Sequence, residues 1–348
     1  TRFNRREFLD RSKQTALGVA AGVTVLENAR SVRGAPAADK VVLAGVGVGG
    51  RGNHLATHPE WGFLCRGDCH YAYVCDPDSR RAGSRVKSFA DMQGGKEPKV
   101  VQDFREALDD SSVDAIVSAT PDHWHALSTV WACMAGKDVY VEKPAHHSCW
   151  EGQKMVEAAR KHKRVVQIGT QNRSAPYNMS ARKFIEDGKL GTIHLCRIYN
   201  QKPPWGMTKK QPNSDAPTGF DWNIWNGPAP KHPYNVGLHR TWHHLWRYSG
   251  GDIANDASHQ IDLARWLIGV KYPKAVYSTG GRFASQGLAE TPDTQVAVYD
   301  FEKLVVTFEL TLYTPYMLKT DGVLRQSDMF PHWPQNATRI EIFGTQGL

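Results

Sequence analysis

The stretch that decides the fold is Lys40-Val-Val-Leu-Ala-Gly-Val-Gly-Val-Gly-Gly-Arg-Gly52, a short β-branched strand that leads directly into glycines. Gly45, Gly47 and Gly50 match the spacing G-x-G-x-x-G, and a helix is expected from residue 54. We assign the first glycine to a tight turn, the second to close approach of a pyrophosphate, and the third to helix–strand packing. The sequence therefore predicts a dinucleotide site, with a glycine-rich turn that binds no ligand as the alternative.

An acidic residue follows the next expected strand, residues 72–75. Asp76 lies at the end of that strand, 26 residues after Gly50. A carboxylate there accepts hydrogen bonds from ribose hydroxyls and repels a 2′-phosphate, so we expect NAD as the cofactor. Arg80 and Arg81 lie nearby and favour a 2′-phosphate, so NADP stays an alternative.

Strands and helices alternate from residue 40 to residue 168, which indicates βαβ units and a parallel sheet. After residue 170 the strands follow one another with few helices between them, which indicates an antiparallel sheet. We therefore expect an α/β protein with an NAD(P)-binding Rossmann domain at 38–170 and a second α/β domain at 171–348. The second domain is expected to have a largely antiparallel open sheet and to be incomplete at its C-terminal end.

Residues 1–37 have the features of a twin-arginine export signal. Arg5 and Arg6 precede Phe8 and Leu9, an uncharged run covers residues 15–26, and Ala35-Pro36-Ala37 resembles a cleavage site. We therefore expect a periplasmic or otherwise exported protein. An amphipathic helix that belongs to the fold is the alternative.

The charge and the hydropathy exclude two classes of partner. Half of the net charge of +8 belongs to residues 1–37, and the other basic residues are scattered, so we expect no nucleic-acid partner. No apolar run is long enough to span a bilayer. Of the six cysteines, Cys65 and Cys69 flank a short loop and are candidates for a disulfide, although their pairing stays open. No Cys/His cluster has zinc spacing, so we expect no metal.

Two further motifs follow strands of the expected parallel sheet. They are Thr120-Pro121-x-x-x-His125 and Glu142-Lys143-Pro144. The carboxyl ends of such strands meet at the crevice where open α/β sheets bind ligands. A solvated Glu-Lys pair on the surface is the ordinary alternative for the second motif. We expect contact with the cofactor from Arg51, Thr120, Pro121, His125, Glu142 and Lys143.

These motifs, together with Gly250-Gly251-Asp252 and His259-x-x-Asp262, resemble in their order the Gfo/Idh/MocA family of glucose-fructose oxidoreductases and inositol dehydrogenases. The resemblance covers about residues 40–348. It implies an NAD(P)-dependent oxidoreductase acting on a secondary hydroxyl of a sugar, cyclitol or glycoside held between two domains. It also implies a homo-oligomer, a dimer or tetramer, for which the open sheet often serves.

The family resemblance implies two catalytic residues. The lysine of the Glu-Lys-Pro motif corresponds to Lys143, which contacts substrate and assists proton movement. The histidine of the later helix corresponds to His259, an acid/base for the reacting hydroxyl. Many relatives have an aspartate four residues before this histidine, where this chain has Asn255. Either Asp256, three residues before His259, takes the orienting role, or Asn255 replaces the acid by a neutral amide.

The substrate pocket is expected beside this helix. Eleven tryptophans are many for this length, and a segment rich in aromatic residues and histidine precedes the helix. Further candidates lie where the family's domain hinge meets substrate, after the last Rossmann strand. The expected substrate contacts are Gln171, Asn172, Arg173, Trp242, His243, Arg247 and Tyr248.

Export bears on the reaction cycle, because a periplasm has no obvious pool of free NAD. We therefore expect a tightly held cofactor that is reduced and reoxidised within one cycle. One alternative is a redox-neutral glycosidase or lyase that acts through a keto-sugar intermediate. Another is a sugar-binding Rossmann protein without catalytic activity.

Overall fold

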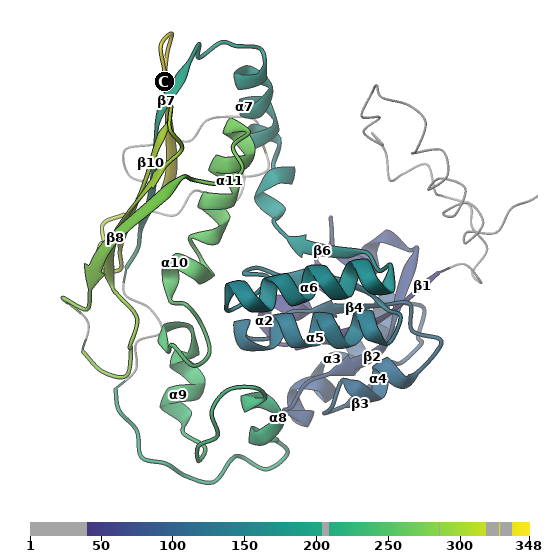
Figure 1. The fold of residues 1–348 in the computed structure, drawn as a ribbon. Coiled ribbons are helices and arrows are strands. Elements are labelled where there is room, and N and C mark those ends of the chain that lie inside the picture. The colour runs from purple at the N-terminus through teal and green to yellow at the C-terminus, as the bar shows by residue number, and fades with distance from the viewer. Residues whose placement is uncertain (1–39, 204–208, 285, 318–326, 328–335) are drawn as a thin grey trace, which may run out of the picture.

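The computed structural model describes residues 40–203, 209–284, 286–317, 327 and 336–348 (Figure 1). The expected export signal, residues 1–37, lies outside the described residues. The described chain forms two sheets, one parallel and one mostly antiparallel, each with its own packed core. The predicted fold class is therefore confirmed. Among the described residues, no helix is long and apolar enough to cross a membrane.

The first sheet has six parallel strands in the order β3-β2-β1-β4-β5-β6. The order reverses between β1 and β4, and ligands bind at such a switch point, beyond the carboxyl ends of the strands. The strands are β1 (Val41–Val46), β2 (Cys69–Cys75), β3 (Lys99–Val101), β4 (Ala115–Ser118), β5 (Asp138–Glu142) and β6 (Val166–Gly169).

Helices cover both faces of this sheet, because its central strands are apolar on both sides. Two helix starts are fixed by side chains. Asp78 caps α3, and Ser148 and Glu151 form a reciprocal capping box at α6. The helices are α2 (Gly50–Thr57), α3 (Ser79–Met92), α4 (Arg105–Asp109), α5 (Asp122–Met134) and α6 (Cys149–His162).

The second sheet has five strands in the order β11-β7-β10-β9-β8, and only the β7–β10 pair is parallel. Figure 1 shows α7 (Pro176–Glu186), α10 and α11 along the face of this sheet that is turned toward the Rossmann unit. Elsewhere on its strands Val276 and Tyr277 are exposed. The strands are β7 (Ile193–Gln201), β8 (Ala275–Gly281), β9 (Thr294–Asp300), β10 (Val305–Thr311) and β11 (Thr338–Gly344).

The helix expected to carry His259 is interrupted. It forms α10 (Asp252–Asn255) and α11 (Ser258–Ile268). The amide of His259 bonds to the carbonyl of Asp256 (3.1 Å) and not to that of Asn255, one turn back. Two side chains bind the Asn255 carbonyl instead, namely Ser258 Oγ (2.8 Å) and Lys143 Nζ (2.9 Å). The interruption therefore turns a backbone acceptor toward Lys143.

The chain that precedes this interrupted helix is rich in aromatic residues and forms a small core of its own. Within it lie α8 (Trp222–Asn226), α9 (Val236–Thr241) and η5 (Trp242–His244). The rings of Trp222 and Trp225 stack with centroids 4.8 Å apart. The aromatic density of this segment thus serves packing.

The candidate disulfide does not form in this structure. Cys65 and Cys69 are both free thiols. Cys69 is buried and its Sγ donates to the carbonyl of Phe63 (2.8 Å), while the Sγ of Cys65 donates to the carbonyl of Gly62 (3.0 Å). Burial raises the pKa of Cys69 to about 12, so this thiol stays protonated near neutral pH.

Candidate nucleotide and substrate site

The loop between β1 and α2 has three glycines with distinct roles. Gly47 has φ +77°, and a Cβ there would lie 2.9 Å from the carbonyl oxygen of Ala119. Gly49 caps α2 and adds no side chain at the helix N-terminus. A Cβ at Gly52 would lie 2.0 Å from the carbonyl oxygen of Gly47, so the helix packs on the loop only without one.

The predicted glycine frame was wrong by two residues. Gly45 lies inside β1 and makes no tight turn, and a Cβ at Gly50 would meet no atom within 4 Å. The run contains a second match to the same spacing at 47, 49 and 52. The turn, the open helix N-terminus and the close packing all fall on this second match. The loop still offers the N-terminus of α2, capped by Gly49, to a pyrophosphate.

Asp76 comes directly after β2, beside this loop. Its carboxyl is buried and accepts a hydrogen bond from the amide of Asp78 (3.0 Å). Burial raises the pKa of Asp76, and the hydrogen bond from Asp78 and the charge of Arg81 oppose that rise. Arg80 is paired with Asp78 (2.9 Å) and is thereby partly neutralised. The carboxylate of Asp76 can accept hydrogen bonds from an adenosine ribose whose hydroxyls are free.

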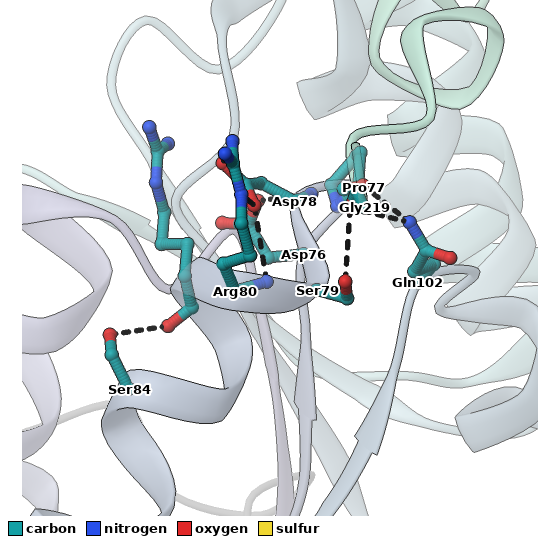
Figure 2. Close-up of polar contacts among 9 residues, drawn as sticks. Asp76, Pro77, Asp78, Ser79, Arg80, Ser84, Gln102 and Gly219 are labelled. Carbon is teal, nitrogen blue, oxygen red and sulfur yellow. Dashed lines mark hydrogen bonds and ion pairs between the residues drawn. The ribbon is translucent and has the colours of Figure 1, made fainter. Parts of the chain in front are cut away.

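A segment far along the chain contacts the loop that follows Asp76. Figure 2 shows Gly219 beside Ser79 and Gln102. The Gly219 carbonyl accepts from the Ser79 amide (2.9 Å), the Ser79 hydroxyl (3.0 Å) and Gln102 Nε2 (3.1 Å). Gln102 Nε2 also donates to the carbonyl of Pro77 (2.7 Å), which accepts from the Asp221 amide (2.9 Å) as well. We call residues 216–221 the crossing segment.

The polar groups expected to contact the cofactor are partly used within the protein. Both ring nitrogens of His125, which is buried, lie against carbonyl oxygens, those of Pro144 (2.6 Å) and Thr120 (2.9 Å). The prediction that His125 contacts the cofactor was wrong, because no ring nitrogen remains for a ligand. Its contacts instead join the segment that begins with Thr120 and Pro121 to the turn after β5.

Arg51 and Glu142 are also joined to each other. The Arg51 guanidinium contacts Glu142 Oε1 at 2.7 and 2.8 Å, and the Glu142 carboxylate is buried. This pair connects the first turn of α2 to the end of β5. Lys143 follows β5 directly, so the pair holds the strand end from which Lys143 extends.

Lys143 reaches across to the second sheet's helices. Its Nζ donates to the carbonyl (2.9 Å) and to the side-chain Oδ1 (3.3 Å) of Asn255. The structure therefore brings together two predicted site residues, Lys143, which follows β5 of the Rossmann unit, and Asn255, which ends α10 beside the second sheet. Both acceptors at Asn255 are neutral.

A carboxylate behind Asn255 is one that sequence reasoning missed as a site residue. Asp122, in the first turn of α5, is 1% exposed. It accepts hydrogen bonds from Asn255 Nδ2 (2.8 Å) and from Ser249 Oγ (2.6 Å). Burial raises the pKa of Asp122, while His125, Ser249, Asn255 and Lys143 oppose the rise. Asp122 occurs in the same motif as Thr120 and Pro121, which was the only signal for it in the sequence.

The carboxylate of Asp256 makes no hydrogen bond to the His259 ring among the described contacts. The same carboxylate pairs with Lys202 Nζ, which also contacts Asp252 (3.2 Å). Asp252 accepts in addition from Asn200, so a buried polar group forms beside the end of β7. Burial favours the neutral form of Asp256, but the charge of Lys202 and its hydrogen bond lower the net pKa. The expected orienting contact between Asp256 and His259 is therefore absent from the described contacts.

His259 is held neutral. Burial, and after it the charge of Lys143, lower its pKa to about 4, while the charge of Asp256 opposes the shift. Its Nδ1 is buried and makes no hydrogen bond in the described structure. A neutral imidazole beside an ammonium group has a free lone pair with which to accept a proton.

The neutral histidines predict that stability falls on acidification. Burial lowers the pKa of His123 and His243 to about 3 and that of His239 to about 4, as for His259. In the unfolded chain these groups bind protons near pH 6.5. Between pH 6.5 and about 5 the unfolded state therefore holds more protons, and the free energy of unfolding decreases as the pH falls.

Urea unfolding at a series of pH values measures this effect. Each such histidine contributes a slope of at most about 1.4 kcal/mol per pH unit. Replacing His123 by glutamine should reduce the slope, whatever it does to stability at pH 7. A free energy of unfolding that stays constant over this window would contradict the assignment of neutral histidines.

The expected substrate contacts divide into two groups. His243 stacks on Trp242 with ring centroids 3.6 Å apart, and the charge of Lys143 is one of the causes that lower its pKa, after burial and His244. Tyr248 is fully buried and donates to Asn226 Oδ1 (2.7 Å). The prediction of Tyr248 as a pocket wall was therefore wrong, because packing uses its ring and its hydroxyl.

The remaining expected contacts lie in or near ion pairs. Arg173, in η4 (Gln171–Ser174), pairs with Asp262 of α11 (Nε to Oδ2, 2.8 Å). Arg247 lies 3.8 Å from Glu290. Gln171 is exposed, and the carbonyl of Asn172 accepts from Asn178 (2.7 Å). Within the described ranges, no group of three or more His, Cys, Asp or Glu side chains can hold a metal ion.

Solved structures share this architecture. The structure of myo-inositol 2-dehydrogenase from Lactobacillus plantarum has a TM-score of 0.65 and 20% identity, over 88% of this chain and 75% of that chain. A levoglucosan dehydrogenase in complex with NADH and levoglucosan has a TM-score of 0.62 and 21% identity, over 88% of this chain and 71% of that one. At this identity the likeness shows the fold.

Sequence comparisons identify the family. An uncharacterised oxidoreductase of Bacillus subtilis is 26% identical over 264 residues, which are 76% of this chain and 62% of that protein. This chain thus spans less than two thirds of the length of that relative. Residues 40–170 match the oxidoreductase family with an NAD-binding Rossmann fold, and residues 225–348 match the Gfo/Idh/MocA C-terminal domain. With both parts matched, the chain belongs to the Gfo/Idh/MocA family of oxidoreductases.

Proposed function

We propose that the protein is an NAD-dependent oxidoreductase that oxidises a secondary hydroxyl group of a sugar, cyclitol or glycoside. The observation that carries the proposal is a neutral His259 close enough to Lys143, which follows β5 directly, for the charge of that lysine to lower its pKa. The related structures named above are dehydrogenases of a cyclitol and of an anhydrosugar. Both of those substrates carry secondary hydroxyls.

The residues present fit NAD. The loop from Gly47 to Gly52 presents a helix N-terminus capped by Gly49, and the Arg81 guanidinium lies 3.3 Å from the place of a Cβ there. A helix N-terminus beside a cation suits a pyrophosphate. The buried carboxyl of Asp76 suits ribose hydroxyls, and its charge repels a 2′-phosphate. When bound, NAD supplies the acceptor for the hydride that leaves the carbinol carbon.

The chain's own groups manage the proton. His259 accepts the hydroxyl proton at an imidazole nitrogen as the carbonyl forms. Lys143 donates a hydrogen bond from Nζ to the alcohol oxygen and stabilises the negative charge that develops there. The half-buried setting of His259 limits the water that competes for this proton. The alcohol thereby becomes a ketone, having lost one hydride and one proton.

We further propose that the cofactor is held tightly and that the protein is exported as a homo-oligomer. The motif at residues 1–37 supports export. The crossing segment supports tight retention, because it bonds to the loop that follows Asp76, where the ribose is expected to bind. The exposed apolar residues on β8 support self-association.

The decisive experiment is to purify the full chain, denature it, and identify any released nucleotide by mass and absorbance. We expect NAD in a ratio near one per chain. Adding myo-inositol or levoglucosan to the native protein then tests for reduced nicotinamide by absorbance, and product analysis separates net oxidation from redox-neutral cleavage. Absence of bound nucleotide, together with no binding of added NAD or NADH, would refute the proposal.

A Gln102→Ala variant tests the crossing segment. The change removes the two hydrogen bonds from Gln102 Nε2 to Pro77 and Gly219. At roughly 1 kcal/mol or more for the pair, release of NADH should become about 5-fold faster or more. Stopped-flow fluorescence of bound NADH measures the rate. Gln153→Ala, on the exposed side of α6, is the matched control and should leave the rate unchanged. Equal rates in both variants would exclude a retaining role.

A further inference from the structure

A buried carboxylate stands directly behind the amide that contacts Lys143. Asp122 belongs to α5 of the Rossmann unit, while Asn255 ends α10 of the other unit. Asn255 Nδ2 lies 2.8 and 3.1 Å from the two oxygens of Asp122. Ser249 Oγ donates to one of these oxygens (2.6 Å). The carboxylate is therefore satisfied by neutral donors.

The direction of these hydrogen bonds orients the amide. A carboxylate only accepts hydrogen bonds, and within an amide only the nitrogen donates. Asp122 therefore draws Nδ2 toward itself, and Oδ1 is left facing Lys143 Nζ at 3.3 Å. With a neutral acceptor at Asp122's place, this preference would be weaker, because hydrogen bonds to charged groups are about twice as strong.

The same contacts relocate a charge. An aspartate at position 255 would place a carboxylate oxygen where Oδ1 of Asn255 now meets Lys143 Nζ. Here the negative charge lies one side chain further back, with the amide of Asn255 between it and Lys143. The carboxylate of Asp256, the adjacent acid, is paired with Lys202. It makes no hydrogen bond to Lys143 Nζ or to the His259 ring among the described contacts, although the charges of both groups help to lower its pKa.

We propose that Asp122 is a positioning residue for Lys143, which fixes the Asn255 amide and supplies from behind it the negative charge that an aspartate at position 255 would supply directly. The inference rests on the proposed function insofar as Lys143 acts on the substrate. The contacts themselves do not depend on which alcohol is oxidised.

A charge swap tests the proposal. Asp122→Asn removes the charge, and Asn255→Asp places two carboxylates in hydrogen-bonding contact, so one of them must take up a proton. Each single variant should lower kcat about 10-fold or more, with little change in KM. The double variant Asp122→Asn/Asn255→Asp restores one charge and one amide in reversed order, and should recover most of the turnover with myo-inositol or levoglucosan as probe.

Ser249→Ala separates positioning from stability. It removes a hydrogen bond to Asp122 without touching the Asn255 amide. It should lower the melting temperature but leave kcat within about 2-fold, because the charge and the amide both remain. Turnover in Asp122→Asn equal to that of Ser249→Ala would overturn the proposal, as would a double variant no better than the worse single variant.

A second readout needs no turnover. The rate at which acetic anhydride modifies Lys143 in the folded holoprotein, followed by peptide mass spectrometry, reports how firmly Nζ is held. We expect modification several-fold faster in Asp122→Asn and slow again in the double variant. If the wild-type protein binds NAD but oxidises neither probe, the proposed substrate class fails while this measurement still decides the role of Asp122. Equal modification rates in all variants would overturn that role.

Discussion

Replacing Lys143 by alanine lowers turnover about 1000-fold and leaves the bound nucleotide in place. The ammonium group is the donor expected to contact the alcohol oxygen, and such a group contributes between about 100-fold and 10,000-fold. Its partners are the carbonyl and amide oxygens of Asn255, which remain in the variant and are reached by water. Steady-state rates with a probe alcohol, together with nucleotide content after denaturation, measure the two effects separately.

Lys137 provides the matched control for this change. It is also a buried lysine whose Nζ donates to a backbone carbonyl, that of Asp110 at 2.6 Å, but it lies before β5 and not after it. Lys137→Ala should therefore lower the melting temperature without a comparable loss of kcat. Full turnover in Lys143→Ala would remove Lys143 from the chemistry.

Replacing Gly52 by alanine should destabilise the protein by about 3 kcal/mol and leave it without bound nucleotide. The new Cβ would lie 2.0 Å from the carbonyl oxygen of Gly47, a backbone atom that moves only if the whole loop moves. Gly47 holds a positive φ and is itself close to the backbone of Ala119, so the displacement would spread through the turn. Urea unfolding and nucleotide content measure both consequences.

Gly50→Ala is the companion variant. Its Cβ would meet nothing within 4 Å, and it begins a helix, where alanine is favoured over glycine by about 0.5 to 1 kcal/mol. We expect unchanged nucleotide content and equal or slightly higher stability. If instead Gly50→Ala were damaging and Gly52→Ala harmless, the dinucleotide motif would be the match at Gly45, Gly47 and Gly50.

These two glycines also show where sequence reasoning reaches its limit. The alternation of strands and helices predicts both sheets correctly, because period and turn signals are local properties. The glycine run contains two overlapping matches to one spacing, and nothing local distinguishes them. The choice depends on φ at Gly47 and on a contact between Gly52 and the Gly47 carbonyl, which only the folded loop defines.

The candidate site shows the same division. Lys143 and Asn255 follow from their motifs, and the structure brings them into contact. Asp122 was missed because its partner, Asn255, is 133 residues away in the chain. A local motif does not reveal a contact between α5 of the Rossmann unit and α10 of the other unit. Tyr248 was misassigned because an aromatic residue in a pocket wall and one in a small core look alike in sequence.

The interruption between α10 and α11 separates two properties of the lysine's surroundings. The position of Lys143 Nζ is held by the main-chain oxygen of residue 255, which no substitution at that residue can delete. The charge that surrounds Lys143 depends on the side chain at residue 255 and on Asp122 behind it. Position 255 is therefore a place where mutation can adjust the pH optimum of a catalyst while the catalytic group keeps its coordinates, which makes it a natural first target for engineering.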